Sequence, residues 1–171
     1  MHLVELLVAL GLAGLVFAAA LGVFSEGQRA HARGAARVES QQTARIALAR
    51  MAREIRQAGG GDLPPIAIAE PTRIAVQHDL DGDGRAAARG ETVTWLWSGD
   101  VLRRNAGAGA QPVVNGVRNL EFSYLDAEGL VTTVPTAIRT VVISLTTAPE
   151  HPGAGGATMT RLTTEVRLRN R

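Results

Sequence analysis

A group of acidic side chains in the segment 78–91, HDLDGDGRAAARGE, has the residue types and the spacing of a cation site. Asp79, Asp81 and Asp83 occupy alternate positions, and Gly84 follows the last of them. Carboxylate oxygens are the hard ligands that Ca²⁺ takes, and a glycine at this point permits the sharp turn that brings them together. The spacing therefore indicates that these three carboxylates could converge on one cation.

The same segment resembles the opening of an EF-hand-like calcium loop. In that pattern the carbonyl of Arg85 would supply the ligand at loop position seven, but Gly90 holds the twelfth position, where a bidentate Glu belongs. Glu91 comes one residue later and could substitute only if the loop bulges. An acidic hairpin tip closed by Asx turns explains the same residues without a metal. Calcium at Asp79, Asp81, Asp83, Arg85 and Glu91 is thus one of two interpretations, and no cofactor is required.

A single carboxylate, Glu5, lies at the start of an apolar run that continues from Leu6 to Phe24 without another charge. About 20 helical residues span a hydrocarbon core of roughly 30 Å. A cleaved signal peptide would have a basic start and a shorter apolar core, and a buried core helix would show polar residues on one face. The run therefore favours a membrane-spanning helix, in which a carboxylate is costly unless it is paired.

Small residues recur inside this apolar run. Gly11, Gly14, Ala18 and Gly22 approximate one stripe at i+3 and i+4 spacing. Each glycine costs about 1 kcal/mol relative to alanine in a helix interior. Small residues are common in membrane helices, and a stripe of them also permits close packing of one helix on another. We favour packing against other subunits.

The stretch LVELLVALGLAGLV, residues 3–16, resembles the N-terminus of type IV pilins and pseudopilins. In those proteins a leader ending in Gly is removed, an aromatic residue becomes the first residue, and a Glu stands fifth. Counting from Met1 puts Glu5 at that position. The chain departs from the pattern at Met1 and His2, where Phe and Thr are usual, and it shows no leader. We expect either a truncated gene model or an engineered start.

This resemblance implies a role for Glu5 and Met1. The fifth-position Glu would neutralise the α-amino group of a neighbouring subunit, here on Met1, and the pairing would set the axial stagger between subunits. The charges agree, because an unpaired carboxylate in an apolar bundle is expensive. Alternatively, Glu5 lies solvated among lipid headgroups without a partner.

The helical pattern continues from Ser25 to Ala58 with a changed face. Ala44, Leu48, Met51 and Ile55 form one apolar stripe that would pack on a domain. Arginines at i+4 spacing line another face, which is either solvated, bound to anionic headgroups or in contact with other subunits. The helix should end at the glycines 59–61.

Short alternating runs follow the glycines and predict strands. We expect them at 66–69, 73–77, 92–97, 101–104, 119–125, 130–134, 139–147 and 161–169. A hairpin turn is expected at 98–100, and a loop at 151–157. The predicted fold class is α+β, with a long N-terminal helix packed on an antiparallel sheet, as in pilins. Its predicted parts are an apolar helical half at 1–24, an amphipathic half at 25–58 and a sheet domain at 59–171.

A weaker resemblance extends over most of the chain. An acidic loop such as 79–84, a strand pair such as 91–105, a segment such as 115–129 and a final strand such as 162–170 also occur in this order in PilW-type minor pilins. The type II secretion minor pseudopilin GspJ has a related design. The resemblance implies contacts with other pilins, and it does not separate these two classes.

Catalytic patterns are missing from the sequence. The four histidines are scattered, no Ser stands in a Gly-x-Ser-x-Gly context, and the absence of Cys excludes thiolate sites. We therefore expect no enzyme. The net charge is only +2, with Arg as the sole strongly basic residue type, so nucleic acid is an unlikely partner.

Together these features predict a minor pilin of a type IV pilus, with a type II secretion minor pseudopilin as the alternative. A membrane-anchored adhesive or DNA-binding module ranks below both. The predicted location is the bacterial inner membrane, crossed once, with the C-terminal domain outside the cytoplasm and later incorporated in a pilus. Other minor pilins are the expected partners.

Overall fold

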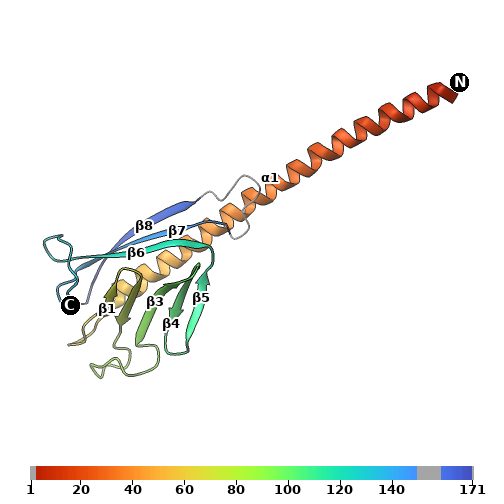
Figure 1. The fold of residues 1–171 in the computed structure, drawn as a ribbon. Helices are drawn as coiled ribbons and strands as arrows, with labels where there is room; N and C mark the ends of the chain where they lie inside the picture. Colours follow the sequence, from red (N-terminus) through yellow and green to blue (C-terminus); the bar gives the residue numbers. More distant parts are fainter. Residues whose placement is uncertain (1–2, 150–158, 171) are drawn as a thin grey trace.

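The computed structural model describes residues 3–149 and 159–170, which form one long helix and two antiparallel sheets. Helix α1 (Leu3–Gln57) projects far beyond the sheets at its N-terminal end, and its C-terminal end lies against them (Figure 1). The fold is therefore α+β, with a long N-terminal apolar helix packed on antiparallel sheets, as the sequence predicts.

The C-terminal end of α1 is fixed by glycine and by the end of the chain. Gly59 has a φ of +88°, a conformation in which glycine is strongly preferred. A Cβ on Gly59 would lie 2.6 Å from the carbonyl oxygen of Asn170, so glycine is also needed for this close approach. The Asn170 side-chain amide donates a 3.2 Å hydrogen bond to the carbonyl of Gln57. The helix thus ends where the glycine run predicts.

The first sheet is a five-stranded meander in which each strand pairs with the next along the chain. Its strands are β1 (Ile66–Glu70), β2 (Arg73–Gln77), β3 (Thr92–Ser98), β4 (Val101–Asn105) and β5 (Ala110–Val114). The β3–β4 hairpin turns through Gly99 and Asp100, with Ser98 paired to Val101. Gly99 has a positive φ of 66°, which a tight hairpin turn of this kind requires.

The second sheet has the order β6-β7-β8 and contains the longest strands. They are β6 (Val117–Leu125), β7 (Thr140–Thr147) and β8 (Thr160–Arg167). Leu120, Leu145 and Leu162 lie side by side across the three strands. The alternation that predicted these strands also places their apolar side chains on one face.

The core lies between α1 and the sheets. The predicted helical stripe of Ala44, Leu48, Met51 and Ile55 is buried, which confirms that prediction. Facing side chains come from both sheets, and the largest of them that are fully buried include Trp95, Leu102, Ile143 and Leu145. The last part of α1 therefore supplies one wall of a single core.

Three features of the sheets differ from the sequence prediction. The strands form two sheets instead of one, and β5 was not predicted because GAGAQP reads as a loop. Pro112 is tolerated in β5 because this strand forms the edge of its sheet, where a missing N–H need not break a ladder. The run 130–134 is not a strand, and only an isolated bridge joins Val131 to Leu125. The predicted loop at 151–157 lies outside the described residues.

Tyr124 joins the two sheets. From β6 its hydroxyl donates a 2.7 Å hydrogen bond to the carbonyl of Glu70, at the end of β1. Burial raises the pKa of Tyr124 above its ordinary value of 10.0, and the nearby Glu70 carboxylate acts in the same direction. The phenol therefore stays neutral in the folded chain at a pH that would ionise it in the unfolded chain.

This shift predicts a loss of stability at alkaline pH. Tyr124 is the only tyrosine, so ultraviolet absorbance of phenolate reports this one group. We expect it to titrate well above pH 10 in the folded chain and near pH 10 in urea. The free energy of unfolding should fall as pH rises above about 10, and Tyr124→Phe should remove that part of the slope. Titration near pH 10 in the folded chain would contradict this burial.

Candidate functional site

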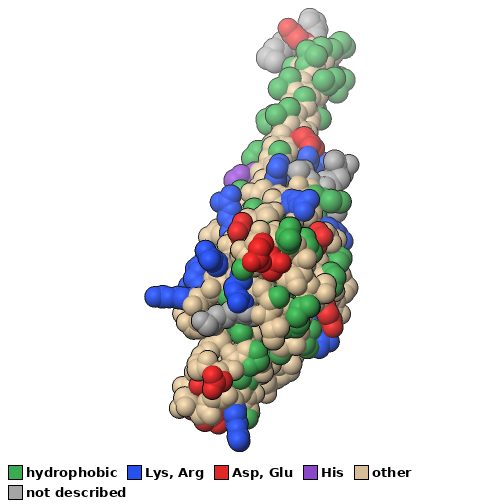
Figure 2. Space-filling view, turned by 90° about the vertical axis from the view of Figure 1, so that its left-hand side faces the viewer, with side chains coloured by type: hydrophobic (Ala, Val, Ile, Leu, Met, Phe, Trp, Pro, Cys, Tyr) green, Lys and Arg blue, Asp and Glu red, His purple; other side chains and the backbone are tan. Residues whose placement is uncertain are grey.

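The first candidate site is the apolar half of α1. From Leu3 to Phe24 every residue is exposed, and Figure 2 shows hydrophobic side chains over the projecting part of the helix. In the part of the chain that the structure describes, α1 is the one helix that is long and apolar enough to cross a membrane. This surface has no cover from the described residues of its own chain.

Glu5 is the only charged residue in this exposed segment. It forms no hydrogen bond or ion pair with any residue that the structure describes. Its proposed counterpart, the α-amino group on Met1, lies outside the described residues. The structure thus leaves the Glu5 carboxylate available to an external partner.

The glycines of the same segment lie in open space among the described residues. A Cβ added at Gly11, Gly14 or Gly22 would meet no atom within 4 Å. Ala18 lies between them on the same exposed helix. Nothing in the described chain therefore requires glycine at these positions.

The second candidate site is the acidic loop between β2 and β3. Glu91 is fully buried and accepts hydrogen bonds from the amides of Leu80 (3.2 Å) and Ala88 (2.7 Å). Asp79 accepts from the amides of Gly82 (2.8 Å) and Gly84 (3.2 Å). These four bonds hold the loop closed with groups of the chain itself.

The structure brings together only some of the predicted cation ligands. Carboxylate oxygens of Asp79, Asp81 and Glu91 lie within 4.8 Å of one another. Glu91 therefore lies beside two of the predicted ligands, although it comes one residue after the twelfth position of the motif. Asp83 is outside this group and accepts a 2.8 Å hydrogen bond from the amide of Arg85. Hydrogen bonds of this kind are the Asx turns of the alternative interpretation, and calcium stays a prediction.

A third feature, centred on Glu54, was not predicted. The Glu54 carboxylate lies on the last turn of α1. It accepts a 2.8 Å hydrogen bond from the indole Nε1 of Trp95 and forms an ion pair with Arg104 Nη2 at 2.9 Å. Arg50 lies one helical turn earlier and pairs with it at 3.2 Å. His78 Nε2 lies 2.9 Å from the Glu54 carbonyl oxygen, so that nitrogen carries the proton. The i,i+4 spacing of Arg50 and Glu54 was visible in the sequence, but the strand partners were not.

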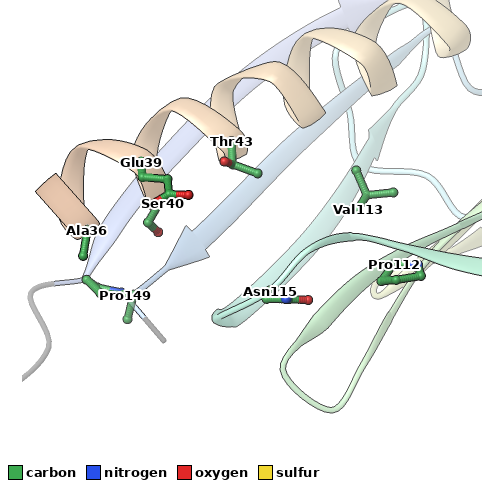
Figure 3. Close-up of a pocket in the computed structure, with 9 residues that line it drawn as sticks. Ala36, Glu39, Ser40, Thr43, Pro112, Val113, Asn115 and Pro149 are labelled. Atoms are coloured by element: carbon green, nitrogen blue, oxygen red, sulfur yellow. The ribbon is translucent and has the colours of Figure 1, made fainter. Parts of the chain in front are cut away.

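A groove of about 400 Å³ lies between α1, β5 and the residues that directly follow β7, Ala148 and Pro149. Glu39, Ser40 and Thr43 of the helix face Asn115 and Pro112 across it (Figure 3). Among the lining residues that the structure describes, Glu39 is the one charged side chain, and none is a His, Cys or Arg. Its described lining therefore offers the hydroxyls of Ser40 and Thr43 beside one carboxylate.

Comparisons with known proteins identify no family for this chain, so a function has to be argued from the geometry described above. No protein-family model matches the chain, and no curated protein does either.

Removal of the Glu54 carboxylate should loosen α1 from the first sheet. Glu54 and Arg104 are mostly buried, with side chains 16% and 20% exposed. Glu54→Ala leaves Arg104 and the Trp95 indole without their partner, so we expect a loss of about 2–4 kcal/mol in the free energy of unfolding. Urea titration followed by tryptophan fluorescence measures it. The control Arg50→Ala removes only a more exposed partner and should cost less than about 1 kcal/mol; equal losses would contradict the central place of Glu54.

Removal of the Glu91 carboxylate should open the acidic loop. Glu91→Ala leaves two amides without an acceptor, and we expect a loss of about 2–4 kcal/mol. Glu91→Gln keeps one acceptor oxygen and should lose about half as much. The control Asp83→Ala changes an exposed residue and should lose no more than about 1 kcal/mol. The same urea titration compares them, and a Glu91→Ala chain as stable as Asp83→Ala would contradict the closed loop.

Proposed function

We propose that this chain is a minor pilin, an assembly subunit of a type IV pilus. The observation that carries the proposal is the apolar segment Leu3–Phe24, which is exposed on all sides, contains one carboxylate and continues without a break into a helix packed on sheets. Such a surface needs a bilayer before assembly and a bundle of helices after it. The resemblance of residues 3–16 to pilins supports the same conclusion.

In this proposal α1 anchors the chain in the bacterial inner membrane, with the sheets outside the cytoplasm. The Glu5 carboxylate pairs with the amino terminus of a neighbouring subunit, because an unpaired charge in an apolar bundle is costly. Gly11, Gly14, Ala18 and Gly22 let neighbouring helices approach closely. Contacts with other minor pilins complete the assembly, and the role is structural, not catalytic.

The proposal does not include nucleic acid binding. Arg29 and Arg33 pair with Glu26, and Arg33, through its hydrogen bond, is the main cause of the lowered pKa of Glu26. Arg50 and Arg104 pair with Glu54. Guanidinium groups paired within the chain are less available to neutralise phosphates.

The experiment compares Glu5→Ala with Glu39→Ala in cells that assemble the filament. Both variants should remain in the membrane fraction, since the apolar run is unchanged. We expect Glu5→Ala to lower the amount of this chain in sheared filaments at least about tenfold, because a charge pair in an apolar bundle is lost. Glu39 is an exposed carboxylate on the same helix, and its loss should leave incorporation unchanged. Normal incorporation of Glu5→Ala would refute the pairing.

The same cells distinguish the pilus from the alternative, a minor pseudopilin of type II secretion. Deletion of the chain should reduce surface pili if the proposal is right. A loss of protein secretion with normal pili would instead assign the chain to the secretion system.

A further inference from the structure

The loop between β6 and β7, residues 126–139, presents apolar side chains to solvent. Leu130, Val131 and Val134 are 66%, 78% and 55% exposed. Single exposed apolar residues are ordinary, but three within five residues form a patch of the kind found at interaction sites. None of them belongs to the core or to the apolar half of α1.

The loop is held in one conformation by hydrogen bonds at its base. The Asp126 carboxylate accepts from the amides of Glu128 (3.1 Å) and Leu130 (2.8 Å), and the Asp126 amide donates 2.9 Å to the Leu130 carbonyl. The Thr132 amide donates 2.9 Å to the carbonyl of Tyr124. A surface ordered in advance loses little entropy when it binds, so the exposed side chains are already arranged for a partner.

The position of the loop identifies the side from which a partner comes. It lies at the end of the sheets away from the projecting N-terminal part of α1 (Figure 1). The helix from Phe24 to Gln57 is roughly 50 Å long at 1.5 Å per residue. If Leu3–Phe24 crosses the membrane, as the proposed function holds, the loop faces away from that bilayer.

The charges around the patch favour a protein over lipid. Within residues 126–139 the two acidic residues, Asp126 and Glu128, outnumber the one basic residue, Arg139, which lies at the base of the loop and donates to the carbonyls of Thr136 and Ile138. An acidic border is repelled by anionic headgroups, and two copies meeting through this loop would oppose like charges. A pocket that is apolar at its centre and basic at its border fits both features.

We propose that Leu130, Val131 and Val134 dock into an apolar pocket, bordered by Arg or Lys, on a different protein subunit at the far end of this chain. The contact is separate from helix bundling and rests on the proposed function only for the orientation relative to the membrane.

The test places a photocrosslinking amino acid at Thr133 of the full chain in its native cells. Thr163, an exposed threonine on β8, is the matched control position. We expect a crosslink from position 133 to one protein, mapped by mass spectrometry to apolar residues with Arg or Lys beside them, and none from position 163. Val131→Asp should lower the yield about tenfold, and Glu128→Arg should lower it several-fold.

Other results overturn the proposal. These are adducts with lipid, crosslinks to another copy of this chain, equal yields from both positions, or a yield that Val131→Asp leaves unchanged. Because Val131 is exposed, the variant should keep the wild-type melting temperature, which separates a lost contact from misfolding. Normal filament incorporation of the chain with no crosslink from position 133, when Val131 is unchanged, would overturn this contact and leave the Glu5 pairing intact.

Discussion

The apolar half of α1 sets the constraint on which the rest of the structure depends. Leu3–Phe24 exposes large hydrophobic side chains on every side, and none of the described sheet residues covers them. Burial of such a surface is the main favourable term in folding and association. The segment is long and apolar enough to cross a membrane, and the sheets are packed on the opposite end of the same helix.

That attachment combines close packing with directional bonds. Ala44, Ala47 and Ala52 are buried among larger side chains, and their small size lets the helix backbone approach the strands. Apolar packing alone is non-directional, so it does not fix how the helix is rotated on the sheets. Glu54 supplies that direction, because one carboxylate accepts from an indole on β3 and a guanidinium on β4. The core and this contact together specify a single orientation.

Local sequence patterns predicted the helix and most of the strands. The features that they did not predict depend on contacts between residues far apart in the sequence. The helix, its buried stripe and most strands followed from periodicity within short windows. The division into two sheets did not, because it depends on which strands pair. β5 was missed because Pro112 and the glycines that precede the strand suggest a loop, although an edge strand tolerates proline. The partners of Glu54 lie 41 and 50 residues away, so no local pattern could show them. Glu91 was placed one residue from its motif position, and only the backbone path brought it beside Asp79.

Three carboxylates of this chain meet the same physical requirement in different ways. A carboxylate removed from water needs hydrogen bonds or an opposite charge. Glu91 is satisfied by the amides of Leu80 and Ala88, and Glu54 by Trp95 and Arg104. Glu5 has no such partner among the described residues, and it is exposed together with the apolar surface around it. Any surroundings that cover the apolar segment must also solvate or neutralise Glu5. A partner must therefore combine an apolar surface with a polar or basic group that can reach this carboxylate.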